Sequence, residues 1–224
     1  MAIAPGAPQA LGVRLIPVLC AAALALTGCV PLEDGTGTAS APPTVADDSA
    51  RLLGQLTVAR ASSMKGYSRN RFPHWRDEGR NCDVRDTVLK RDGEQIRLTG
   101  CNVVGGQWVS VYDDRTFDDP SDVDIDHMVP LANAWRSGAD KWTDEERGDF
   151  ANDLTRPQLR AVSASSNRSK GDQDPSQWKP PNRDFWCEYA AEWIAVKHYW
   201  KLRITTEEKA ALSDMLDTCP AARE

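Results

Sequence analysis

Two short polar motifs, well separated in the chain, carry the side chains best suited to chemistry. The first is Asp126-His127, followed by Pro130, and the second runs from Asn167 to Gly171. An imidazole with a pKa near ~6.5 can accept a proton at neutral pH. Carboxylate and amide oxygens are the ligands that a hard cation such as Mg²⁺ prefers. A base beside a divalent cation suits hydrolysis of a phosphodiester, because water must lose a proton while charge grows on the phosphoryl oxygens.

The second motif is also basic, and Arg168 and Lys170 are expected to hold phosphates that flank the scissile bond. The alternative is that both merely pair with Asp172 and Asp174. The chain carries a net charge of −6, which argues against a protein that coats nucleic acid through bulk charge. Nucleic-acid contact must therefore be local. Since no base-reading helix, zinc finger or aromatic stacking motif is visible, little sequence specificity is expected.

Three elements must position these motifs. They are a strand at Val123–Val129 that Pro130 ends, a second strand at Leu159–Ser163, and a helix that begins at Asn167 after a cap from Ser165 or Ser166. Adjacent residues of a regular strand point to opposite faces, so Asp126 and His127 can face one site only where the chain bends. We expect that bend near Pro130. Asp124 either adds charge to the site or faces solvent.

The remaining pattern is rich in helices with one small antiparallel sheet, which predicts the α+β class. The expected elements are a helix from Ala50, a short helix from Val84, strands at Ile96–Leu98 and Val103–Val109, a capping-box helix from Thr143 to about Asn152, an aromatic helix after Cys187, and a last helix opened by Thr205 and Glu208.

Together, Asp126–Pro130, Leu159–Ser163 and Asn167–Asp172 resemble the HNH endonuclease family, and most closely its exported bacterial members. The resemblance implies a ββα-metal core, a hairpin and a helix, embedded in a helix-rich domain. It implies that His127 is the general base, and that Asp126 and Asn167 bind one divalent ion, Mg²⁺ or alternatively Mn²⁺. It further implies that the substrate is nucleic acid, with DNA favoured, and that the products carry 5′-phosphates.

Gln158 occupies the position at which that family has an asparagine that braces the histidine loop. A glutamine amide offers the same donor and acceptor on a stem one methylene longer. Bracing by Gln158 is therefore expected, with a changed geometry.

The N-terminus reads as an export signal. Residues 1–28 contain an apolar run that is too short to cross a membrane but long enough for a signal peptide. The run ends in Leu-Thr-Gly-Cys29, which resembles the bacterial lipobox and implies lipidation of Cys29 as a membrane anchor. The alternative is an ordinary secretory signal. Residues 29–49 have almost nothing to bury and predict a flexible tether to a domain at 50–224.

Export places the remaining cysteines in an oxidising compartment. Cys82, Cys101, Cys187 and Cys219 form an even set, which allows three pairings. We favour Cys82 with Cys101 and Cys187 with Cys219, because each pair is local. A zinc site is the competing interpretation, but no Cys-x-x-Cys spacing supports it.

Two other interpretations of function stay open. A non-catalytic envelope lipoprotein could retain an HNH-like fold and bind a partner through it, or a phosphodiesterase could act on small substrates. His74 and His198 are expected to be structural, since a lone histidine is more often packed than catalytic. The expected location is the cell envelope or the extracellular space, and the sequence does not indicate an oligomeric state.

Overall fold

The computed structural model describes residues 44–79 and 81–220. The expected signal peptide, Cys29 and most of the tether lie outside the described residues. Helix α1 (Val45–Gln55) begins inside the segment assigned to the tether, which corrects that boundary. Thr44 caps the helix by accepting a hydrogen bond from the Asp47 amide, and the Asp47 carboxylate binds the Thr44 amide in return. This reciprocal capping box starts the helix earlier than its apolar pattern does.

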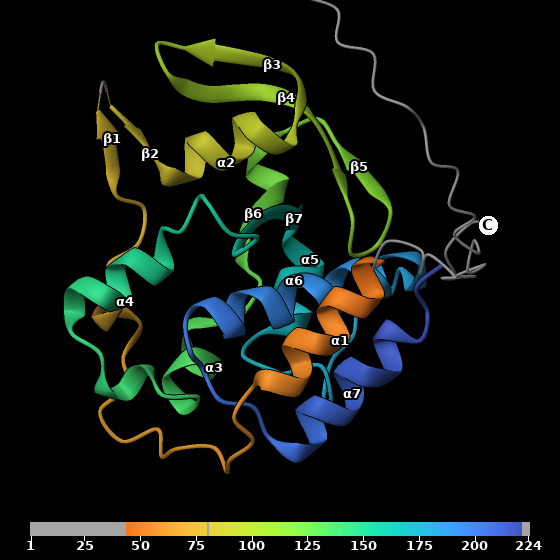
Figure 1. Cartoon of the computed structure of the whole chain (residues 1–224). Helices are drawn as coiled ribbons and strands as arrows, with labels where there is room; N and C mark the ends of the chain where they lie inside the picture. Colours follow the sequence, from red (N-terminus) through yellow and green to blue (C-terminus); the bar gives the residue numbers. More distant parts are fainter. Residues whose placement is uncertain (1–43, 80, 221–224) are drawn as a thin grey trace, which may run out of the picture. The chain divides into compact units, whose positions relative to one another are not determined.

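The described residues form an α+β fold, the class that the sequence predicts (Figure 1). Within them, three small antiparallel sheets lie among several helices. After α1, the described elements are η1 (Arg69–Arg71), β1 (Asp77–Gly79), β2 (Cys82–Asp83), α2 (Val84–Asp92), β3 (Glu94–Thr99), β4 (Asn102–Ser110), β5 (Arg115–Phe117), η2 (Pro120–Asp122), β6 (Val123–His127), α3 (Leu131–Arg136), η3 (Ala139–Lys141), α4 (Asp144–Ala151), β7 (Leu159–Ser163), α5 (Ala164–Lys170), η4 (Arg183–Phe185), α6 (Trp186–Tyr199) and α7 (Thr206–Leu216).

The two motifs lie on one compact unit, in which β6 and β7 pair antiparallel and α5 follows β7 directly. The register is regular from Val123 opposite Ser163 to His127 opposite Leu159. The expected serine caps are wrong, since Ser163 caps α5 by accepting a hydrogen bond from the Ser166 amide. Helix α5 contacts both strands.

The β6–β7 hairpin is buried on both faces. Val123, Ile125, Leu159 and Ala161 join a hydrophobic cluster with α2 and β4. Val162, on the opposite face of β7, joins the main cluster together with α6, α7 and α1. Burial on both faces explains why apolar residues occupy both faces of β7.

The free edge of β7 is covered by the end of α2. A guanidinium nitrogen of Arg91 donates to the Leu159 carbonyl, and the Asp92 carboxylate accepts a hydrogen bond from the Ala161 amide. These two side chains take the hydrogen bonds that a further strand would make.

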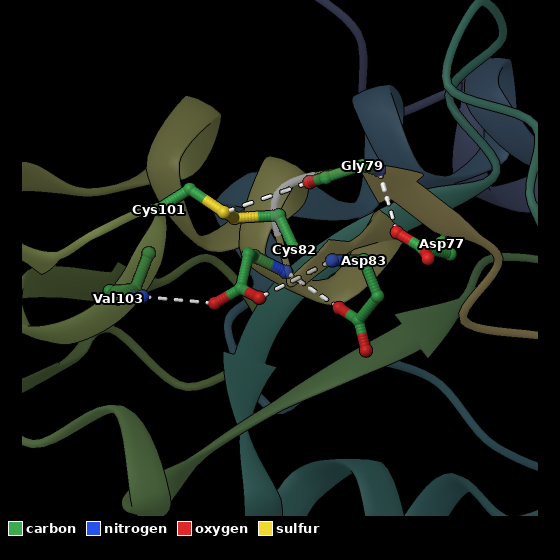
Figure 2. The surroundings of a disulfide bond; sticks show 7 residues. Asp77, Gly79, Cys82, Asp83, Cys101 and Val103 are labelled. Atoms are coloured by element: carbon green, nitrogen blue, oxygen red, sulfur yellow. Dashed lines mark hydrogen bonds between the residues drawn. A yellow bond between two sulfur atoms is a disulfide. The ribbon is translucent and has the colours of Figure 1, made fainter.

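Two disulfides close local loops, in the pairing that the sequence favours. Cys82 joins Cys101 at the turn between β3 and β4, beside the start of α2 (Figure 2). Cys187, in the first turn of α6, joins Cys219 after α7. Across 44–79 and 81–220, the helices are each too short or too polar to cross a membrane.

Candidate functional site

The His127 imidazole is held by the end of α4. The ring is buried, with 5% of the residue exposed, and its Nε2 lies 2.9 Å from the carbonyl oxygen of Ala151. Ala151 is the last residue of α4, where carbonyls have no partner within the helix. A carbonyl can only accept, so Nε2 carries the proton and Nδ1 keeps its lone pair.

Burial lowers the pKa of His127 from 6.5 to about 3, and the bond to the Ala151 carbonyl opposes this shift. Nearby positive charge on Arg69, His74 and Lys170 lowers the pKa of His127 further. The imidazole is therefore neutral at physiological pH, with Nδ1 free to accept a proton.

Two rings from the segment before β1 cover His127. The Trp75 ring lies 5.8 Å from the imidazole, centroid to centroid, and tilts by 31° to it. The His74 ring lies 6.4 Å away, edge-on. Trp75 has a backbone φ of 60°, an uncommon conformation for a bulky residue that is often found at functional sites.

Asn152 fixes this covering segment. Its side-chain nitrogen donates to the Pro73 carbonyl at 2.7 Å, and its oxygen accepts from the Arg76 amide at 3.0 Å. His74, expected to be structural, and Trp75, which the sequence does not single out, both lie against the His127 ring. The only signal for them was the adjacency of two ring residues after Pro73, because their contact with His127 is long-range.

The Asp126 carboxylate lies on the opposite face of β6. Its Oδ2 accepts hydrogen bonds from the Tyr112 hydroxyl and from the Lys170 ammonium, both at 2.5 Å. Lys170 also donates to the carbonyls of His127 and Met128, at 2.8 and 2.9 Å. This ammonium therefore ties α5 to the end of β6.

The expected phosphate-binding role of Lys170 is wrong. Its side chain is 0% exposed and its three donors are used inside the protein. Burial lowers the pKa of Lys170, and the charge of Asp126 opposes that shift. Arg168, by contrast, is exposed on α5.

Asn167 lies one helical turn before Lys170 and contacts the same face of β6. Its side-chain nitrogen donates to Asp124 Oδ2 at 3.1 Å. Three residues of a helix rise about 4.5 Å and two residues of a strand about 6.6 Å. One turn of α5 can therefore contact Asp124 and Asp126, which are two apart on the strand.

The three expected site residues do not share one face. Asp126 and Asn167 lie on the α5 side of the hairpin, whereas the His127 ring lies on the side of Trp75. The expected bend is wrong, because the pairing of β6 is regular through His127. The imidazole and the two oxygen-bearing side chains thus lie on opposite faces at the end of β6.

The donor set on the α5 side fits a hard cation. Asp124 and Asp126 contribute carboxylate oxygens and Asn167 an amide oxygen, and the hydrogen bonds of these side chains use Oδ2 of each carboxylate and Nδ2 of the amide. No cluster of three or more His, Cys, Asp or Glu side chains suited to a metal occurs within the part of the chain that the structure describes. A bound cation would therefore rely on the Asn167 amide oxygen and on water.

Gln158 makes the contacts that bracing requires. Its Oε1 accepts from the Val129 amide at 3.1 Å, and its Nε2 donates to the Val129 carbonyl at 3.0 Å. The Gln158 carbonyl also accepts from the Met128 amide at 2.7 Å. The loop after His127 is thus attached to the residue before β7 by three hydrogen bonds.

Comparison with known proteins gives two matches. Residues 85–215 match the family described as GmrSD restriction endonucleases, C-terminal domain. An uncharacterized secreted protein of the fungus Arthroderma benhamiae is 49% identical over 181 residues, which cover 80% of this chain and 89% of that protein. No solved structure matches the chain.

Proposed function

Because the chain belongs to the family of GmrSD restriction endonuclease C-terminal domains, we propose that it is an exported, metal-dependent HNH-type endonuclease that hydrolyses phosphodiester bonds of nucleic acid. One observation carries the proposal. The Ala151 carbonyl fixes the proton of His127 on Nε2 and leaves Nδ1 unprotonated. The imidazole is a ready-made acceptor for a proton from water.

His127 acts as the general base. Nδ1 takes one proton from a water, the water oxygen bonds to phosphorus, and the bond between phosphorus and the 3′ oxygen breaks. The departing 3′ oxygen takes a proton from a second water, so the products are a 3′-hydroxyl and a 5′-phosphate. The phosphodiester is anionic, and negative charge beside the ring raises the pKa of His127 toward its ordinary value. Substrate binding therefore strengthens the base when it is needed.

The α5 side supplies positive charge. Asp126 and Asn167, with Asp124 beside them, would hold a divalent ion, most simply Mg²⁺. Such an ion would supply positive charge for the phosphoryl group. Arg168, exposed on the same helix, would contact a flanking phosphate.

A plasmid-nicking assay tests this function. With Mg²⁺ the wild type is expected to nick plasmid, and EDTA to stop it. His127→Ala should lower the nicking rate at least roughly 100-fold, since a general base contributes about 10²–10⁴. His198→Ala is the matched control, because the His198 ring contacts Gln55, at the end of α1, and not the candidate site.

The outcomes separate the alternatives. Nicking by His127→Ala at the wild-type rate, with its circular-dichroism spectrum unchanged, would exclude His127 as the base. A wild type that binds but never cleaves would support the non-catalytic interpretation. Cleavage of small diesters without cleavage of DNA or RNA would support a phosphodiesterase.

The two disulfides and the secreted relative support export. A lipid anchor on Cys29 is a separate proposal. It rests on the lipobox resemblance alone, because Cys29 lies outside the described residues. Globomycin treatment of a bacterial host would test it, because blocked signal cleavage of a lipoprotein leaves a longer chain. An unchanged chain length would indicate an ordinary secretory signal.

A further inference from the structure

An arginine and a tyrosine lie stacked on the surface, between two hollows. The Arg156 guanidinium carbon lies 3.4 Å from the centre of the Tyr199 ring, and Tyr199 is 51% exposed. Among the described residues, the side chain of Arg156 makes one hydrogen bond, a long one of 3.4 Å from Nη1 to Asp153. The other donors of the planar guanidinium are available to an anion.

Each half of the stacked pair borders a different hollow. The hollow on the arginine side measures about 330 Å³, and its walls include Arg91, Thr155, Arg156 and Arg160. The hollow on the tyrosine side measures about 430 Å³, and its walls are Trp142, Glu146, Tyr199, Trp200 and Lys201. The stacked pair thus joins the wall of a basic hollow to the wall of an aromatic one.

A buried carboxylate holds both halves in place. Oδ1 of Asp153 accepts hydrogen bonds from the amides of Thr155 and Arg156, at 3.0 and 3.1 Å. Oδ2 of Asp153 accepts from the indole nitrogen of Trp200 at 2.9 Å. Asp153 is 6% exposed, so its four contacts are well shielded from water. The walls of the two hollows are therefore positioned before any ligand binds.

The aromatic side is rigid. The Trp200 ring lies 5.5 Å from the Trp142 ring and 5.4 Å from the Tyr199 ring. Trp142 and Trp200 are partly buried and pack against the main core. A flat group that enters this hollow meets ring surface that loses little entropy on binding.

The basic hollow borders β7, the strand that pairs with the one bearing His127. The Ala151 carbonyl that holds His127 is two residues from Asp153. Leu159, a wall of the basic hollow, is the strand partner of His127. A strand bound in the basic hollow would thus lie along β7, next to the strand that bears His127.

Arg156 is the best anchor for a phosphate. Arg91 is paired with Asp92 at 2.6 Å, and Arg160 with both Glu188 and Glu192. Arg156 has one ion pair, with Asp153, and at 3.4 Å it is longer than the pair of Arg91. The bases of a duplex already have both faces covered, whereas an unpaired base can stack on an exposed ring. An available guanidinium beside exposed aromatic surface therefore fits a single strand.

Resting on the proposed nuclease function, we propose that the paired hollows bind single-stranded nucleic acid, with a phosphate on Arg156 and an unpaired base on Tyr199 and Trp200. Duplex substrate would then be cleaved best where it is frayed or opened. The site would favour single strands over duplex without favouring any sequence, because every base has a face that can stack.

The test measures dissociation constants by fluorescence anisotropy, in the His127→Ala background so that the strand stays intact. The probes are short labelled oligothymidylate and oligouridylate, which separate DNA from RNA, and a blunt duplex. Tyr199→Ala and Arg156→Ala should each weaken single-strand binding about tenfold or more, since stacking of one base contributes ~1–3 kcal/mol. Tyr199→Phe, which keeps the ring, should restore most of it.

Arg51→Ala is the matched control, because Arg51 is an exposed, ion-paired arginine on α1. Single-strand binding by both alanine variants as tight as that of this control would overturn the site. An equal loss of duplex binding in these two variants would also overturn it. Displacement of the labelled strand by a neutral oligosaccharide, but not by unlabelled strand, would overturn it as well and would indicate a surface for sugars. A wild type that fails to nick plasmid would instead remove the nuclease proposal, while the binding result would still decide this site.

Discussion

At the residue scale, the end of β6 separates a base from an acid. The His127 ring faces Trp75 and the Ala151 carbonyl, while the next side chain back, Asp126, faces Lys170 and Tyr112. Strand alternation alone produces this separation. It keeps the Lys170 ammonium from bonding to the imidazole and lets the same ammonium neutralise the carboxylate.

The buried imidazole gives a testable pH dependence. Folding lowers the pKa of His127 from 6.5 to about 3, so the unfolded chain binds a proton at pH values where the folded chain does not. The free energy of unfolding should fall as pH drops from 6.5 toward about 3, by up to about 1.4 kcal/mol per pH unit. His127→Gln should lose this contribution.

The measurement is urea unfolding of wild type and His127→Gln at several pH values between 6.5 and 4, since the difference between the two cancels the other titrating groups. Parallel dependence of the two free energies on pH would show that His127 is not protonated differently on folding.

At the residue scale, the sequence could identify candidate side chains but not their partners. Asp126, His127 and Asn167 were identifiable because they form a motif. Lys170 was misassigned, because sequence shows a basic residue but not that the helix turns it inward to Asp126. The contacts of Trp75 and Asn152 join segments far apart in the chain, so no local pattern reveals them.

At the element scale, local patterns predicted most of the fold. The capping boxes at Thr143 and Thr205 start α4 and α7 where expected, since both bonds of a capping box are encoded within four residues. Strand β7 has its predicted bounds. The start of α1 was missed, because the polar composition around Thr44 obscured its capping box with Asp47.

The loop after β6 depends on one amide. Gln158 is 0% exposed and bonds both backbone groups of Val129. Gln158→Met keeps the length of the side chain but leaves two buried backbone groups unsatisfied. The free energy of unfolding should fall by about 2–4 kcal/mol, measured by urea titration.

Gln173→Met is the matched control, because the hydrogen bond from the Gln173 side-chain amide to the Ser169 carbonyl is exposed to solvent. It should change the free energy of unfolding by less than about 0.5 kcal/mol. A Gln158→Met variant as stable as this control would show that water can replace the brace.

At the scale of the whole molecule, the β6–β7 hairpin separates two hydrophobic clusters, and each supports one face of the candidate site. The main cluster, with α6 and α7, lies behind Asp126 and Lys170. The second, with α2 and β4, lies behind His127. A destabilising substitution in the main cluster should therefore disturb Asp126 and Lys170, whereas one in the second cluster should disturb His127.

The Cys187–Cys219 disulfide joins the two helices that complete the main cluster. It closes a loop with a sequence separation of 32, and replacing both cysteines by alanine should lower the free energy of unfolding by about 3–4 kcal/mol. Chemical denaturation of the oxidised proteins would measure the loss. An unchanged denaturation midpoint would mean that packing of α6 on α7 suffices without the crosslink.

The side chains that cover the open edge of β7 have a consequence for self-association of the protein. Arg91 and Asp92 already satisfy the Leu159 carbonyl and the Ala161 amide. An incoming strand from a second molecule would have to displace a salt-bridged pair before gaining any backbone contact. Fibre growth and strand exchange are thus discouraged at the edge of the β6–β7 hairpin.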